Sequence, residues 1–234
     1  MTRRKVAVVG MPAARQLRLE AAVVLGPESL LPALALPVVT ALHSLSPATG
    51  AESWRSLFIE NCQSLLPIAF GLAAVPLLLR DAEHGTLEQA LTLPVPAVAA
   101  LRLLLVLGGN ALLAASWLAL LAAAWGPVAL GAGLWAALGP TLLLSGLGVL
   151  AATAAGRATV GQLVVIGWVL GDLVLRLLGW GAAFPALQWL DAFAYRWPVT
   201  GVAWPAVAGA QAAVGVILLI AVVRRSRALL LRLL

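Results

Sequence analysis

Long apolar stretches separated by short polar interruptions make up most of this chain. Six of them, between 19 and 26 residues long, lie at residues 27–45, 57–79, 101–126, 134–155, 163–184 and 205–223. A helix that crosses a bilayer needs about 20 apolar residues, whereas a barrel strand needs about half that number and alternates in polarity. The pattern therefore predicts an all-α membrane protein with six transmembrane helices.

The longest polar interruption separates the second stretch from the third. Residues 80–102 read RDAEHGTLEQALTLPVPAVAALR. Thr86 is a suitable N-cap for a short helix over residues 87–91, and Pro94 and Pro96 would end that helix. We expect residues 80–100 to form a cytoplasmic loop that contains this short helix. Composition alone favours an ordinary loop.

Two further segments have patterns that fit neither a span nor a solvated loop. Residues 13–25 are amphipathic and predict a short helix at the membrane interface. Residues 185–204 are too apolar for a solvated loop and too interrupted to span, so we expect short re-entrant helices in the outer leaflet. No repeat or low-complexity linker divides the chain, and residues 1–234 are expected to form a single transmembrane domain.

Composition and charge fit a membrane protein with both ends in the cytoplasm. Hydrophobic residues make up 62% of the chain, charged residues 10%, and the net charge is +6. With both termini inside, twelve of the fifteen basic residues lie on the cytoplasmic side: Arg3, Arg4, Lys5, Arg15, Arg18, Arg80, Arg102, Arg157, Arg224, Arg225, Arg227 and Arg232. This bias obeys the positive-inside rule, so the basic excess indicates topology and contact with membrane lipids, not nucleic acid.

Tryptophan positions support the same topology. Six of the nine fall at the outer ends of the predicted spans or in the outer loops: Trp54, Trp125, Trp135, Trp189, Trp197 and Trp204. Because indole rings prefer the headgroup region, their gathering on one side agrees with the assigned spans.

Polar residues inside the predicted spans are few. Asp172 and Arg176 lie in the middle of the fifth span, four residues apart and thus on one helix face. They would either line a conduit or dimer interface or form a neutral pair that locks packing. Near the outer end of the second span, Glu60, Asn61 and Gln63 would form an outer gate, or Glu60 would reach headgroup water.

Catalytic and cofactor motifs are missing from the sequence. It has no HExxH, CxxC or Walker phosphate loop, and Cys62 is its single cysteine. Ser145 lies within a span, but no histidine of the fifth or sixth span accompanies it. We therefore expect no bond chemistry and no metal or cofactor bound by this chain.

The loop carries a string that resembles a known family. From Glu83 to Val95 the chain reads E-x-G-T-L-E-x-x-L-x-x-P-V, which is similar to the second-loop motif of ABC type-2 exporter permeases. The resemblance implies six spans that form half of a pore, an interfacial helix before the first span, and re-entrant helices between the fifth and sixth. It also implies a coupling helix in this loop that docks on a separate ATPase subunit.

The resemblance assigns roles to residues of the loop. The implied ATPase contacts are Asp81, Glu83, His84, Gly85, Thr86, Leu87, Glu88 and Leu91. Leu87 and Leu91 would fill an apolar cleft on the ATPase, and the acids would pair with basic residues at its rim. ATP and Mg²⁺ would bind the ATPase subunit. A second copy of this chain or a homologous permease would complete the exporter in the bacterial cytoplasmic membrane.

Two alternatives come from other functional classes. One is a six-span membrane scaffold or assembly factor without a transport cycle. The other is a secondary transporter, for which only Asp172 and Arg176 suggest an ion site at the bilayer midplane. For an exporter, the candidate substrates include peptides, lipids, drugs and glycan precursors.

Overall fold

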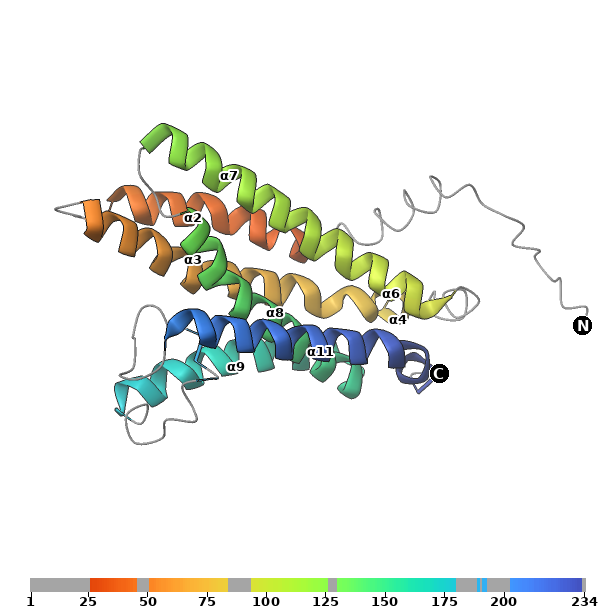
Figure 1. Ribbon diagram of the computed structural model, residues 1–234. Coiled ribbons are helices and arrows are strands. Elements are labelled where there is room, and N and C mark those ends of the chain that lie inside the picture. The colour runs from red at the N-terminus through yellow and green to blue at the C-terminus, as the bar shows by residue number, and fades with distance from the viewer. Residues whose placement is uncertain are drawn as a thin grey trace, which may run out of the picture.

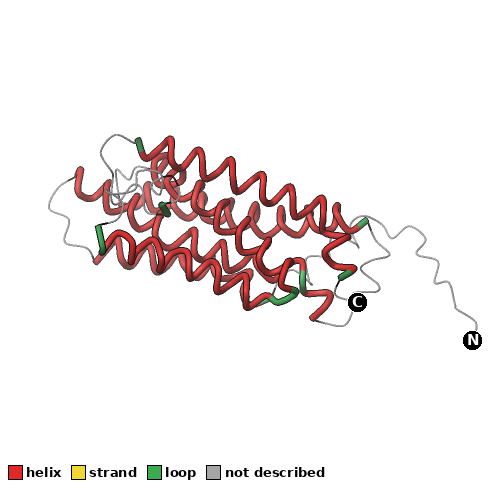
Figure 2. The backbone as a smooth tube through the Cα atoms, turned by 90° about the horizontal axis from the view of Figure 1, so that it is seen from below, coloured by secondary structure: helices red, strands yellow, loops and turns green. Residues whose placement is uncertain are grey.

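The structure is a computed structural model in which the described residues form a bundle of helices that run side by side (Figure 1). It describes residues 26–45, 51–83, 94–125, 130–179, 189, 191–192 and 203–232. Over those ranges the secondary structure is helical and contains no strand, as Figure 2 shows from a second direction. The predicted all-α fold is confirmed for this part of the chain.

The described elements follow one another with short breaks. In chain order they are η1 (Pro27–Leu30), α2 (Leu31–Leu45), α3 (Ala51–Ala74), η2 (Val75–Leu78), α4 (Arg80–Glu83), α6 (Val95–Leu103), η3 (Leu104–Gly108), α7 (Gly109–Trp125), α8 (Leu130–Ala155), α9 (Ala158–Leu177) and α11 (Trp204–Leu231). Both η1 and η2 are 3₁₀-helices, whereas η3 is a π-helical turn that joins α6 to α7 without a break.

Five helical stretches are long and apolar enough to cross a membrane. They are Phe58–Leu78, Val95–Ala123, Leu130–Ala155, Ala158–Leu177 and Trp204–Leu231. Each overlaps one of the predicted spans from the second to the sixth. The first predicted span corresponds to η1 and α2, whose apolar part, Pro27–Leu42, is a shorter helix. The structure therefore supports a multi-pass membrane protein with five candidate spans.

Helix α8 lies at the centre of the bundle and packs against α3, α9 and α11. Glycines let α8 and α11 approach until their backbones touch. A methyl group on Gly139 would overlap the backbone of Ala208, and one on Gly215 would overlap the backbone of Leu142. Contact this close is a common way for membrane helices to associate, because hydrocarbon provides no hydrophobic drive between them.

The three glycines of α9 divide into two groups. Gly161 of α9 packs against the backbone of Gly148 on α8, so a methyl group there would overlap the neighbouring helix. Gly167 and Gly171 of α9 face open space, with no other atom within 4 Å of the position that a Cβ would take. Within the described residues, Gly161 alone of these three serves contact between α8 and α9.

The two ends of the bundle differ in charge. At the first, called the basic end, η2 leads from α3 into α4, and α6 begins. Leu230, in the C-terminal part of α11, packs against η2 and α6 there. The arginines of this end are Arg80, Arg102, Arg157, Arg224, Arg225, Arg227 and Arg232. The other end, called the opposite end, contains the last turns of α9 and the start of α11 (Figure 1).

The fifth predicted span ends earlier than its apolar pattern predicts. Helix α9 ends at Leu177, and Gly179 follows with a φ of 72°. The N–H groups of Leu178 and Gly179 donate to the carbonyls of Val174 and Arg176 over 3.0 and 2.9 Å. A glycine in this left-handed conformation ends helices, since other residues adopt it at a cost.

This early end corrects the predicted position of the intramembrane pair. Asp172 and Arg176 lie in the last two turns of α9, at the opposite end of the bundle, and not in the middle of a span. Several predicted segments lie outside the described residues: the interfacial helix of residues 13–25, the loop residues 84–93, and most of residues 185–204.

We predict that Gly215→Ala weakens the bundle more than Gly167→Ala. The first methyl group meets the α8 backbone and should lower the free energy of unfolding by about 3 kcal/mol. The second enters open space and should leave that free energy unchanged or slightly raised. Unfolding of the purified protein by SDS, followed by circular dichroism, measures both. Equal effects of the two substitutions would contradict the backbone contact between α8 and α11.

Candidate functional site

A buried ion pair joins the two helices from which the loop of residues 84–93 leaves and returns. Arg102 of α6 donates to both carboxylate oxygens of Asp81 on α4, over 2.6 Å from Nη1 to Oδ2 and 3.3 Å from Nη2 to Oδ1. The two side chains are only 5% and 10% exposed. A bidentate pair fixes the relative position of its helices more strictly than a single bond does. We call this pair the stem clamp.

The sequence of η2, which follows α3 directly, explains the position of the stem clamp. Pro76 has no N–H for an α-helical bond, and the chain there tightens into the 3₁₀-helix η2, closed by the Leu79 N–H on the Pro76 carbonyl at 3.0 Å. Arg102 Nη1 also donates to the Leu77 carbonyl at 3.3 Å. One guanidinium therefore binds both the end of η2 and the acid that follows it.

A second ion pair connects the same region to the start of the first apolar helix. Arg80 Nη2 lies 3.1 Å from Glu28 Oε2 of η1, with the arginine side chain 7% exposed and the glutamate 38%. A methyl group on Gly26 would overlap the Arg80 guanidinium, so a larger residue there would displace that side chain. The Ser29 hydroxyl donates to the Gly26 carbonyl at 2.6 Å and fixes this entry to the helix.

Apolar side chains close the stem clamp off from water. Leu78, Val95 and Leu230 line, together with the clamp, a gap of about 10 Å³. A gap of that size is about the minimum for one water molecule. Losing either partner of such a pair leaves a buried charge without its counterion and costs about 3–5 kcal/mol.

The structure describes only part of the predicted ATPase contact set. Asp81 is buried and its carboxylate faces Arg102, so in this chain it holds the stems of the loop together and does not face outward. Glu83 belongs to α4, but its side chain lies outside the described residues. The remaining contacts, from His84 to Leu91, also lie outside them. Their predicted role in binding an ATPase stays a prediction.

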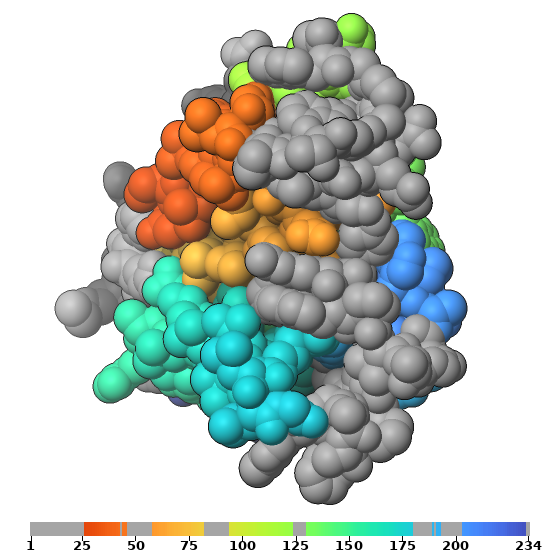
Figure 3. All heavy atoms as spheres, turned by 90° about the vertical axis from the view of Figure 1, so that its left-hand side faces the viewer, coloured from red at the N-terminus to blue at the C-terminus, as the bar shows by residue number. Residues whose placement is uncertain are grey.

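A second polar cluster lies at the opposite end, which Figure 3 views with the last turns of α9 in cyan and the start of α11 in blue. Arg176 donates through Nε to Asp191 Oδ1 at 3.1 Å and also forms an ion pair with Asp191 through Nη2. Asp172 Oδ2 lies 3.7 Å from the same Nε. The side chains are 14%, 5% and 13% exposed for Arg176, Asp191 and Asp172. The guanidinium of Arg176 thus pairs with two carboxylates.

Gln211 of α11 completes this cluster. Its side-chain amide donates to the backbone carbonyls of Asp191 at 2.8 Å and Trp189 at 3.3 Å. Asp191 is therefore held between Arg176 of α9 and Gln211 of α11, and both Asp191 and Ala192 are buried. The sequence analysis did not identify Asp191 or Gln211. Two features of the sequence could have pointed to them. Asp191 is the single acid of residues 185–204, and Gln211 is the single side-chain amide of the last apolar stretch.

The predicted outer-gate residues lie on α3, beside residues of the same helix that belong to the apolar core. Gln63 is buried, and Glu60 and Asn61 are half-buried. Among the described residues, the Asn61 side-chain nitrogen and the fully buried Ser145 hydroxyl find no hydrogen-bond partner. The part of the chain that is described contains no group of three or more His, Cys, Asp or Glu residues able to hold a metal ion. The gate role stays a prediction.

Comparisons with known proteins identify no relative. No family model, curated protein or solved structure matches the chain. Any functional conclusion therefore rests on the residues and contacts described above.

We predict that Arg176→Gln lowers the free energy of unfolding by about 3–5 kcal/mol, because it leaves two buried carboxylates facing each other without their counterion. Arg157→Gln, at the exposed start of the same helix, is the matched control and should cost less than about 1 kcal/mol. SDS unfolding measures both values. A cost for Arg176→Gln no larger than that of the control would rule out the cluster as a structural support.

Proposed function

We propose that this chain is the membrane subunit of an ATP-driven ABC exporter of the type-2 class. It would form the substrate path and couple to a separate ATPase subunit, without bond chemistry of its own. The observation that carries the proposal is the stem clamp. Asp81 and Arg102 lie on the two stems of the loop that holds the family-like motif, and they tie those stems to each other.

The geometry of the stems would let a movement of the loop reach the membrane helices. A force on residues 84–93 would reach α4 before the loop and α6 after it. Because the stem clamp joins α4 to α6, both helices would move together. The Arg80–Glu28 pair would pass the movement to η1, and the contacts of Leu230 would pass it to α11. Closure of the ATP-bound partner subunits would then tilt several helices of this chain together.

Helical lengths support a sixth span formed by η1 and α2. A 3₁₀-helix rises about 2.0 Å per residue and an α-helix about 1.5 Å. The continuous run Pro27–Leu45 therefore covers about 30 Å, which is the thickness of the hydrocarbon core. With six spans, the start of η1 and the end of α11 are on the same side of the membrane, in agreement with their contacts at the basic end.

Charge supports a cytoplasmic position for the basic end. Seven described arginines belong to it, whereas Arg176 lies at the opposite end and is neutralised by acids. Positive residues near span ends are retained on the cytoplasmic side. This orientation would face the loop toward an ATPase in the cytoplasm of a bacterium. ATP and Mg²⁺ would bind that subunit, and a second permease, identical or homologous, would complete the path.

We predict the topology of single cysteines placed on a Cys62→Ala background. Leu45→Cys, at the exposed end of α2, should react with a membrane-impermeant maleimide on intact cells. Arg227→Cys should react only after the membrane is permeabilised. Labelling of both positions on the same side would contradict a sixth span through η1 and α2.

We predict that replacing Gly85, Thr86 and Leu87 together with alanine detaches the ATPase. The protein would be co-expressed with a candidate ATP-binding subunit, and the amount of ATPase that co-purifies should fall at least about tenfold, a loss of about 1.4 kcal/mol or more. Leu231→Ala, an exposed leucine of the basic end outside the loop, is the matched control and should retain the ATPase. Unchanged co-purification and unchanged ATP-driven transport would overturn the proposal.

A further inference from the structure

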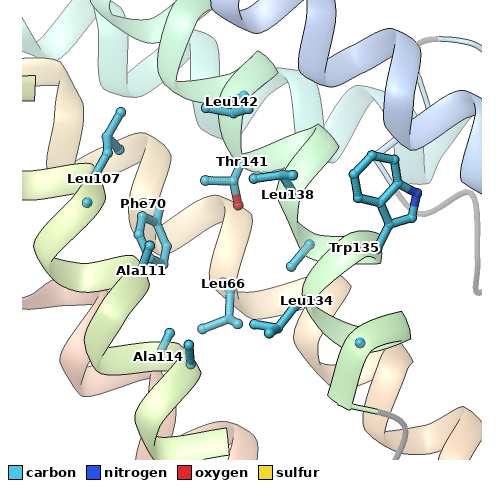
Figure 4. Close-up of a pocket in the computed structure, with 14 residues that line it drawn as sticks. Leu66, Phe70, Leu107, Ala111, Ala114, Leu134, Trp135, Leu138, Thr141 and Leu142 are labelled. Atoms are coloured by element: carbon cyan, nitrogen blue, oxygen red, sulfur yellow. The ribbon is translucent and has the colours of Figure 1, made fainter. Parts of the chain in front are cut away.

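Two apolar cavities flank the π-helical turn η3. The larger, of about 580 Å³, lies between α7 and α8 and includes Phe70, Ala111 and Leu138 in its lining (Figure 4). The smaller, of about 370 Å³, lies between α6 and α11. Both volumes fall within or close to the range of small-molecule sites in proteins. Leu107 and Gly108 line both cavities, so the two adjoin at η3, and together they are called the groove.

The π-helical turn shapes this junction. Such turns insert one residue into a helix and frequently occur at functional sites. The Asn110 side chain donates to the Val106 carbonyl at 2.9 Å and to the Ser29 carbonyl at 3.1 Å, which anchors the turn to η1. At the junction, a Cβ on Gly108 would meet only a Leu104 methyl group, at 3.7 Å. Glycine therefore keeps the passage between the cavities open.

The groove has a charge at one end and hydrocarbon along its length. Leu104, Leu138 and Ile220, which line it, are 69%, 41% and 46% exposed, so it opens on the side of the bundle. Of the described residues that line the smaller cavity, Arg224 alone is charged, and it lies at the basic end. Water finds no hydrogen-bond partner in an apolar cavity. Within a bilayer, hydrocarbon is the material that fills it.

We propose that this groove binds one acyl chain of an anionic phospholipid, with the headgroup phosphate at Arg224. The smaller cavity follows α6 and η3 from Ala100 to Gly108, about 12 Å of helix. The hydrocarbon of one leaflet is about 15 Å deep. A chain that begins at Arg224 therefore fills the smaller cavity and reaches the junction at Gly108, where the larger cavity receives its end.

The bound lipid would lie between α11 on one side and α6 and η3 on the other, and would hold these elements apart. These elements adjoin the stem clamp, because α6 holds Arg102 and α11 contributes Leu230. Basic pockets between membrane helices are known to take anionic lipid headgroups. This inference concerns the chain alone and does not depend on an ATPase partner.

Native mass spectrometry tests the proposal. The full-length protein is first exchanged into a mixture of equal amounts of phosphatidylglycerol and phosphatidylcholine. The wild-type protein should retain phosphatidylglycerol in preference to phosphatidylcholine. Arg224→Gln should lower that preference about fivefold, the effect expected for one arginine near an anionic lipid. Arg225→Gln changes the neighbouring exposed arginine, which does not line the groove, and should leave the preference unchanged.

A second pair of variants tests the apolar part of the site. Gly108→Leu should fill the junction and reduce retention of both lipids, whereas Gly109→Leu points into open space outside the groove and should bind lipid as the wild type does. The proposal is overturned if Arg224→Gln and Arg225→Gln behave alike, or if both leucine variants retain lipid equally. It is also overturned if Gly108→Leu alters only the number of protein copies in the complex, since a second chain would then cover the groove.

Discussion

The Asp81–Arg102 ion pair is the contact that the organisation of the basic end depends on. It closes the stems of the loop of residues 84–93, caps the end of η2 through the Leu77 carbonyl, and is covered by Leu230 of α11. Removing only one partner of such a pair leaves a buried charge without this counterion, so the surrounding helices are constrained to keep both. It lies between the apolar core and the loop, the position from which the proposed coupling movement would reach α4 and α6 together.

The bilayer imposes the rest of the architecture. Backbone groups must be satisfied within each span, so the chain forms helices, and glycines such as Gly139 and Gly215 bring α8 and α11 into backbone contact. Charges are kept at the two ends. The stem clamp lies at one, and the cluster around Arg176 at the other. A carrier that binds ions at the midplane has less support from this arrangement, because its expected acidic site lies at a helix end.

Periodicity and length predicted the helices well, since apolar stretches of about 20 residues leave few alternatives. They located five candidate spans and missed the end of α9, because Gly179 stops the helix while the apolar composition continues. The Asp172–Arg176 pair was found from its spacing. Asp191 was not, because its contact with Arg176 joins segments that no local pattern links. For the same reason no local pattern indicated that Asp81, expected on a docking surface, would face Arg102 in the interior.

A double-mutant cycle on the stem clamp tests the central claim most directly. Asp81→Asn, Arg102→Gln and the double variant are unfolded with SDS, and their free energies of unfolding are compared with that of the wild type. The account predicts that each single substitution costs about 3–5 kcal/mol and that the double costs no more than either, which gives a coupling energy of about 3 kcal/mol or more. Additive costs, with a coupling energy near zero, would contradict it.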